Sequence, residues 1–110
     1  MEILHQRLNK SAQVKGSILL RENGLHLSSI LPPNIPQRRQ LSAYLANVWR
    51  QLYKSYEETE GIFRIKDDIQ VYMKYLPSKN LLFSTFSSPA NDSSMKEIMN
   101  HYASLFTNLF

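Results

Sequence analysis

Apolar residues recur at helical spacing between Pro36 and Glu58, a stretch with no interior glycine or proline. On a helical wheel four of them share one stripe: Leu41, Leu45, Val48 and Leu52. The polar residues of the stretch gather on the opposite side. This pattern predicts a long amphipathic helix that packs on one face of a sheet.

Aromatic residues extend the apolar arc of this helix beyond the stripe. Tyr44 lies on one flank, and Trp49, Tyr53 and Tyr56 lie on the other. The arc then covers about half of the helix circumference, which is wider than one sheet face requires. Either another element of the same chain covers the aromatic flank, or a second protein does. We favour a second protein, because a chain of 110 residues has few other elements to provide the cover.

The rest of the chain alternates between strand-like and helix-like patterns. Ile18-Leu19-Leu20 is a continuous apolar run, which is typical of a strand covered on both faces, and Asn23-Gly24 is a strong hairpin signal. Ser94 and Glu97 fit a capping box ahead of a final amphipathic helix. The remaining expected elements are a helix over Glu2 to Ala12 and strands over Val14 to Arg21, Leu25 to Ile30, Ile62 to Lys66, Ile69 to Leu76 and Leu81 to Ser87.

The order of these elements is helix, two strands, helix, three strands, helix. Short turns join the strands within each group, so we expect a mostly antiparallel sheet. Helices before, between and after the strand groups predict an α/β sandwich with helices on both faces. The length predicts a single domain over residues 1–110.

Composition and charge narrow the possible partners. The chain has no cysteine, so it has no disulfide framework and no thiolate metal site. The net charge is +4, yet Arg38 and Arg39 are the only adjacent basic residues, a pattern that argues against nucleic-acid binding. We also expect no signal peptide and no transmembrane helix, so any contact with a membrane would be indirect.

The residues that usually carry catalysis are sparse. We expect the three histidines, His5, His26 and His101, to lie on the surface, and none belongs to a metal-binding pair. Asp67-Asp68 reads as a turn, and the three glycines form no phosphate-binding loop. We therefore predict no catalytic, metal-binding or cofactor-binding residues, and expect that the protein is not an enzyme.

Three stretches in this order and spacing resemble a known family: Gly16 to Leu20 with its Asn-Gly turn, Leu45 to Trp49, and Leu76 to Phe83. The chain is similar over nearly its whole length to roadblock-type (dynein light chain) domains. Within that family it most resembles the small subunits of Ragulator-like complexes at the lysosome or vacuole. It departs from the family pattern in its short first helix, its short third strand and the lack of a C-terminal extension.

The resemblance implies a roadblock-like fold with a five-stranded antiparallel sheet in the order 2-1-5-4-3. It also implies dimerisation through the second helix and the third strand, so that two sheets fuse into one. The expected dimer-interface residues are Trp49, Tyr53, Tyr56, Ile62, Phe63, Arg64 and Ile65. Pairing would remove the aggregation hazard of an open strand edge, although Arg64 and Lys66 could instead keep that edge solvated.

The resemblance further implies a non-catalytic scaffold subunit. Its partners would be a second roadblock-type chain, with a heterodimer favoured over a homodimer, a lipid-anchored scaffold subunit and Rag-type GTPases. The complex would hold these GTPases at the cytosolic face of the lysosome or vacuole for TOR nutrient signalling. Two alternatives remain open: a cytoplasmic dynein light chain, and a regulator that stimulates a small GTPase.

Overall fold

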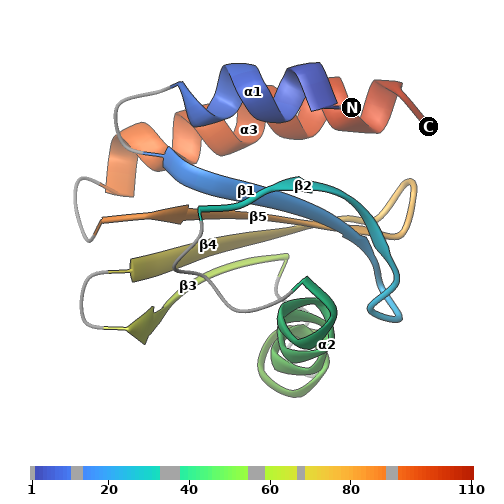
Figure 1. The fold of residues 1–110 in the computed structure, drawn as a ribbon. Helices are drawn as coiled ribbons and strands as arrows, with labels where there is room; N and C mark the ends of the chain where they lie inside the picture. The colour runs from blue at the N-terminus through green and yellow to red at the C-terminus, as the bar shows by residue number, and fades with distance from the viewer. Residues whose placement is uncertain (1, 11–13, 33–37, 55–58, 67–68, 89–91) are drawn as a thin grey trace.

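The computed structural model describes residues 2–10, 14–32, 38–54, 59–66, 69–88 and 92–110 (Figure 1). Helices cover both faces of the sheet, with α1 and α3 on one face and α2 on the other. The elements are α1 (Glu2–Asn9), β1 (Val14–Arg21), β2 (His26–Ile30), α2 (Arg38–Val48), the π-helix η1 (Trp49–Tyr53), β3 (Glu60–Lys66), β4 (Ile69–Leu76), β5 (Leu81–Ser87) and α3 (Asp92–Asn108).

The five strands form one antiparallel sheet in the order β2-β1-β5-β4-β3, which confirms the predicted fold. The Asn23-Gly24 turn closes the β1–β2 hairpin as expected. Gly24 has a φ of 94°, a left-handed conformation that glycine adopts without a steric penalty. Its N–H donates to the C=O of Arg21, and the N–H of Leu25 donates to Asn23 Oδ1.

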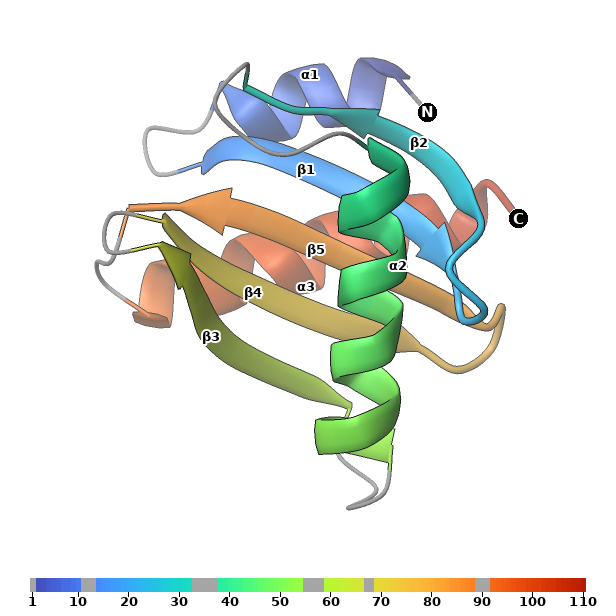
Figure 2. The same cartoon turned by 60° about the horizontal axis from the view of Figure 1, so that its bottom comes forward.

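Both faces of the central strands are buried, which explains their continuous apolar runs. Ile18 and Leu20 of β1 pack with α2, whereas Leu19 packs with α1 and α3. The edge strand β2 is only half-buried along its length, in agreement with its alternating sequence. Figure 2 shows α2 crossing one sheet face alone, so this face has the thinner cover.

Two local predictions are wrong. The α3 helix begins at Asp92, so Ser94 lies inside its first turn and is not the N-cap of a capping box. His5 is fully buried and not on the surface, because α1 turns the i, i+3 pair His5 and Leu8 toward the sheet and leaves Ile3 exposed. The expected turn at Asp67-Asp68 and the helix start near Pro36 lie outside the described residues.

A chain of hydrogen bonds satisfies the buried imidazole of His5. Its Nδ1 lies 2.7 Å from Ser17 Oγ, and its Nε2 lies 2.7 Å from Ser28 Oγ. Ser17 Oγ donates to Asn9 Oδ1 at 2.9 Å, and Asn9 Nδ2 donates to the C=O of Ile30. Because the Ser17 proton is directed at Asn9, the proton of the neutral ring belongs on Nδ1, and Ser28 donates to Nε2. The network joins α1 to β1 and β2.

Candidate interaction surface

The β3 strand forms one edge of the sheet and, within the described ranges, pairs with β4 alone. The N–H of Tyr75 donates to the C=O of Thr59 at 2.7 Å, which makes these residues a hydrogen-bonded pair of the antiparallel ladder. Such pairs alternate, so Gly61 and Phe63 also bond β4 through their backbones. The residues between them direct their backbone N–H and C=O groups to the open edge: Glu60, Ile62 and Arg64.

Apolar side chains flank this open edge. Ile62 is 42% exposed on the face that carries α3, since it pairs with Tyr72 of that face. On the opposite face Tyr44 of α2 is 47% exposed and meets Phe63 edge-on, with ring centroids 6.4 Å apart. An open edge with exposed apolar neighbours is suited to pairing with another strand.

A shallow hollow of about 340 Å³ lies beside this edge. It is lined by Gln40, Leu41 and Tyr44 of α2 and by Ile65 of β3. The lining is mostly apolar, so a side chain from a partner bound at the β3 edge could fill it. The edge, Tyr44 and the hollow are together called the α2–β3 surface here.

The expectation that a second protein covers Trp49 is wrong. The indole is only 3% exposed and belongs to the core between α2 and the sheet. It stacks on Tyr75 of β4, with ring centroids 4.4 Å apart and planes at 29°. The cover therefore comes from the same chain, which was the alternative interpretation of the aromatic flank.

Polar contacts at the end of the β1–β2 hairpin hold this cover in place. Lys54 Nζ lies 5.4 Å from the centroid of the Trp49 ring and 2.7 Å from Glu22 Oε1. The Lys54 hydrogen bond lowers the pKa of Glu22. The Tyr75 hydroxyl oxygen lies 3.1 Å from Glu22 Oε2 and 2.8 Å from Asn80 Oδ1, and burial raises the pKa of Tyr75. These contacts shield the stacked Trp49–Tyr75 pair from solvent.

The other predicted interface residues divide between the α2–β3 surface and the undescribed part of the chain. Ile62 and Arg64 are exposed, and Phe63 and Ile65 are half-buried beside α2. The structure thus gathers four predicted residues on one strand. Tyr56 lies outside the described residues, as does the side chain of Tyr53.

Sequence reasoning did not select Tyr44 as an interface residue. The buried arc of α2 is rotated by roughly 60° from the predicted stripe, so that Trp49 faces inward and Tyr44 outward. Small residues permit this rotation: Ala46 and the backbone of Ser42 lie next to Gly24 of the hairpin. The signal was present in the sequence, because the interior arc needs small residues where a helix approaches a turn closely.

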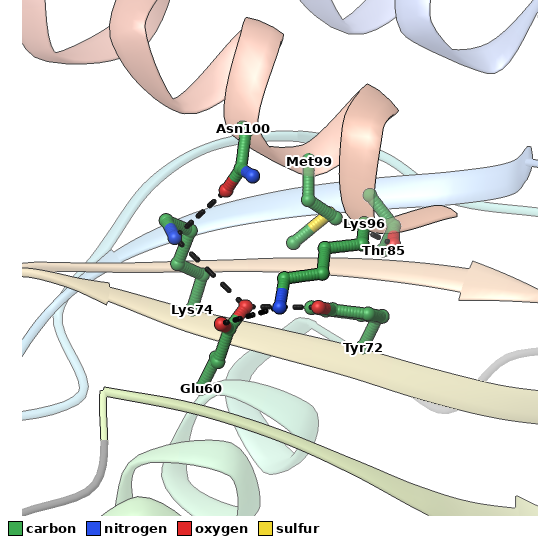
Figure 3. Close-up of polar contacts among 7 residues, drawn as sticks. All are labelled: Glu60, Tyr72, Lys74, Thr85, Lys96, Met99 and Asn100. Atoms are coloured by element: carbon green, nitrogen blue, oxygen red, sulfur yellow. Dashed lines mark hydrogen bonds and ion pairs between the residues drawn. The ribbon is translucent and has the colours of Figure 1, made fainter. Parts of the chain in front are cut away.

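A polar cluster lies on the α3 side of β3 (Figure 3). Tyr72 donates to Glu60 Oε2 at 2.8 Å, and the ammonium groups of Lys74 and Lys96 each lie 3.9 Å from the Glu60 carboxylate. Lys74 also donates to Asn100 Oδ1 at 2.9 Å. These partly exposed ion pairs contribute little stability, but they fix the Glu60 carboxylate beside the open edge.

No group of three or more His, Cys, Asp or Glu among the described residues could hold a metal ion. No helix within the described ranges is long and apolar enough to cross a membrane. His101 is exposed against Tyr102, as the sequence predicted, whereas His26 is half-buried and bonds Ser29.

Comparison with solved structures identifies the fold. Myxococcus xanthus MglB matches with a TM-score of 0.81 and 19% identity over 98% of this chain and 92% of that chain. A roadblock/LC7 domain from Streptomyces avermitilis matches with a TM-score of 0.76 and 11% identity over 99% and 96%. An MglB in a tetrameric arrangement matches with a TM-score of 0.75 and 14% identity over 93% and 81%.

No family model and no curated protein matches the sequence. At these identities the structural matches define the fold, which is that of roadblock/LC7 domain proteins, as the sequence resemblance implied. Among the described residues, the α2–β3 surface combines outward backbone groups of β3 with the exposed ring of Tyr44.

Proposed function

We propose that this protein is a non-catalytic scaffold subunit that dimerises with a second roadblock-type chain through the α2–β3 surface. The observation that carries the proposal is the open β3 edge, with exposed Ile62 on one side and exposed Tyr44 on the other. A partner strand would satisfy the outward backbone groups, and its side chains would enter the hollow beside Leu41. The tetrameric arrangement of one similar MglB supports assembly as a property that this fold allows.

Within this proposal the dimer belongs to a Ragulator-like complex. A lipid-anchored subunit would attach the complex to the cytosolic face of the lysosome or vacuole, where it would hold Rag-type GTPases for TOR signalling. The support is the sequence resemblance over Gly16 to Leu20, Leu45 to Trp49 and Leu76 to Phe83. The outer faces of α1 and α3 lie away from the α2–β3 surface, so a dimer would keep them available for further subunits.

A second candidate is a regulator of a small GTPase. The bacterial sources of the similar structures favour it, since the resemblance implies that some prokaryotic roadblock-type proteins stimulate such enzymes. A GTP hydrolysis assay with purified small GTPases tests this candidate. Acceleration by the protein would support it, and an unchanged rate at saturating protein would remove it.

Affinity capture from the native source tests the main proposal. We expect tagged protein to retain a second roadblock-type chain together with Rag-type GTPases, identified by mass spectrometry. Ile62→Lys should lose the roadblock-type chain, because it places a charge at the pairing edge. Ile3→Lys is the matched control, since Ile3 is 64% exposed on α1, away from β3. Capture of a dynein intermediate chain, or equal capture by Ile62→Lys and wild type, would contradict the proposal.

A further inference from the structure

An open cleft of about 670 Å³ lies between the tip of the β1–β2 hairpin, the helix η1 and the turn that joins β4 to β5. Its charged lining consists of three cationic side chains and one carboxylate: Arg21, Arg50, Lys54 and Glu22. Among the described residues, none lines both this cleft and the hollow of the α2–β3 surface. We call it the hairpin cleft.

Hydrogen bonds hold the walls of the hairpin cleft together. The N–H of Glu22 donates to the C=O of Asn80 at 3.2 Å, which ties the hairpin to the β4–β5 turn. Arg21 Nη1 donates to the C=O of Lys79 at 3.1 Å, and the Arg21 guanidinium lies 5.4 Å from the centroid of the Phe110 ring. A guanidinium has five N–H donors, so the bond to Lys79 leaves others for a ligand. A side chain fixed in this way loses little conformational freedom on binding.

The charges around the hairpin cleft are positive overall. Lys54 Nζ lies 2.7 Å from Glu22 Oε1, so these two charges offset each other. Arg50 also lies close enough to the Glu22 carboxylate to help lower its pKa, after the larger effect of the Lys54 hydrogen bond. Glu22 therefore stays ionised at neutral pH and holds Lys54 at the cleft. With Arg21 and Arg50 added, the lining attracts an anion.

An apolar side chain at the same cleft narrows the class of ligand. Leu25 lines the cleft and is 60% exposed. Its backbone is fixed, because its N–H donates to Asn23 Oδ1 and its C=O accepts from the N–H of Arg21 at 2.8 Å. A lone phosphate group would use the cations but not Leu25. A peptide with carboxylates beside an apolar residue would use both, and carboxylates match the planar fork of arginine.

We infer that the hairpin cleft binds an acidic peptide segment of a partner protein, with carboxylates on Arg21 and Arg50 and an apolar side chain against Leu25. The cleft volume of about 670 Å³ is in the range of ligand sites and far exceeds one carboxylate, in agreement with a segment of several residues. This inference goes beyond the proposed function, because it adds a second binding surface away from the β3 edge.

Fluorescence anisotropy with a labelled synthetic peptide tests the inference. The probe has the core sequence Glu-Glu-Leu-Glu-Glu, and the whole chain is titrated into it at low salt. We expect saturable binding that weakens as salt is added, because salt screens exposed charges. A matched peptide with Gln in place of each Glu keeps the shape but loses the charges. It should bind on the order of tenfold more weakly, since hydrogen bonds between charged groups are lost.

Substitutions in the protein locate the binding site. Arg50→Glu should weaken binding of the acidic peptide by about fivefold or more, because it replaces an attraction by a repulsion. Arg7→Glu makes the same charge change at an exposed position of α1 and should leave the affinity unchanged. Leu25→Ser should abolish the preference for this peptide over one with Ser in place of Leu. Circular dichroism verifies that each variant keeps the fold.

Several results would overturn the inference. One is the absence of saturable binding at low salt, and another is equal binding of the Glu and Gln peptides. Equal affinities of wild type and Arg50→Glu, or loss of binding in Ile62→Lys in place of Arg50→Glu, would show that the peptide lies elsewhere. Binding of inorganic phosphate that the acidic peptide does not displace would replace the peptide as occupant. Affinity capture through the β3 edge is a separate measurement, so the proposed function and this inference fail independently.

Discussion

The buried imidazole of His5 makes the stability of the fold depend on pH. Burial, with smaller contributions from nearby positive charge such as that of His26, lowers the pKa of His5 from 6.5 to about 4. The unfolded chain therefore binds more protons than the folded chain between pH 6.5 and pH 4. The free energy of unfolding therefore falls as the pH is lowered through this window. The contribution of the neutral His5 ring to stability is fully present above pH 6.5.

The magnitude follows from the size of the pKa change. One pKa unit corresponds to about 1.4 kcal/mol, and the loss at pH 4 relative to pH 7 comes to about 3 kcal/mol. Total stabilities of small domains are about 5–15 kcal/mol, so a loss of this size is readily measured. The hydrogen bonds to Ser17 and Ser28 keep the neutral ring satisfied and so do not offset the cost of charging it.

Urea denaturation between pH 7 and pH 4 measures this effect, with His5→Gln as the variant that cannot titrate at this position. Wild type should lose about 3 kcal/mol more than His5→Gln over the interval. His101→Gln removes an exposed imidazole and should reproduce the wild-type curve. Parallel curves for wild type and His5→Gln would refute the reasoning, and so would an NMR titration in which His5 gains its proton near pH 6.5.

Three further substitutions test the packing. Trp49→Ala should lower the free energy of unfolding by about 3–5 kcal/mol in urea denaturation. Trp49→Phe should keep most of that free energy, because the stacking on Tyr75 survives and Trp49 Nε1 has no acceptor to lose within the described residues. Equal losses would contradict the stacking. Gly24→Ala should lower the melting temperature, because a side chain at φ 94° strains the backbone by about 1–2 kcal/mol. An unchanged melting temperature would exclude that strain. Tyr72→Phe should cost about 1 kcal/mol by removing the hydrogen bond to Glu60, with a thermal shift as the readout; no shift would mean that the bond adds nothing.

The strands could be predicted from local sequence, whereas their order in the sheet was implied by the family resemblance. Ile18 to Leu20 is apolar on both sides because α2 covers one face of β1 and α1 with α3 covers the other. The Asn23-Gly24 turn required a left-handed residue, and glycine provides it. Each feature is recorded in a few consecutive residues, so both are visible in the sequence.

The positions that follow Trp49 in the central helix could not be predicted in the same way. A wheel at 100° per residue assumes an α-helix throughout, but the helix changes to π-helical hydrogen bonding at Trp49, where the N–H of Lys54 bonds the C=O of Trp49. Each turn then holds an additional residue, which displaces every later position on the wheel. The partner of Trp49 is Tyr75, which is distant in sequence and leaves no trace in a local pattern.

The burial of His5 was missed for a related reason. Its position among polar neighbours in α1 suggested solvent, but two serines from other elements, Ser17 and Ser28, satisfy it, and Asn9 of α1 itself bonds Ser17. The serines lie on β1 and β2, and only the folded sheet brings them beneath α1. A buried polar network is a property of the tertiary structure, and no spacing rule along one helix reveals it.

The two ends of the chain lie in the α1–α3 layer, on the far side of the sheet from α2 (Figure 1). A fluorophore or surface tether attached at either end would therefore lie on the opposite side of the sheet from α2. Immobilised molecules would present α2 and β3 outward. Encounters between single molecules, and the lifetime of each encounter, could then be followed without the label obstructing the contact.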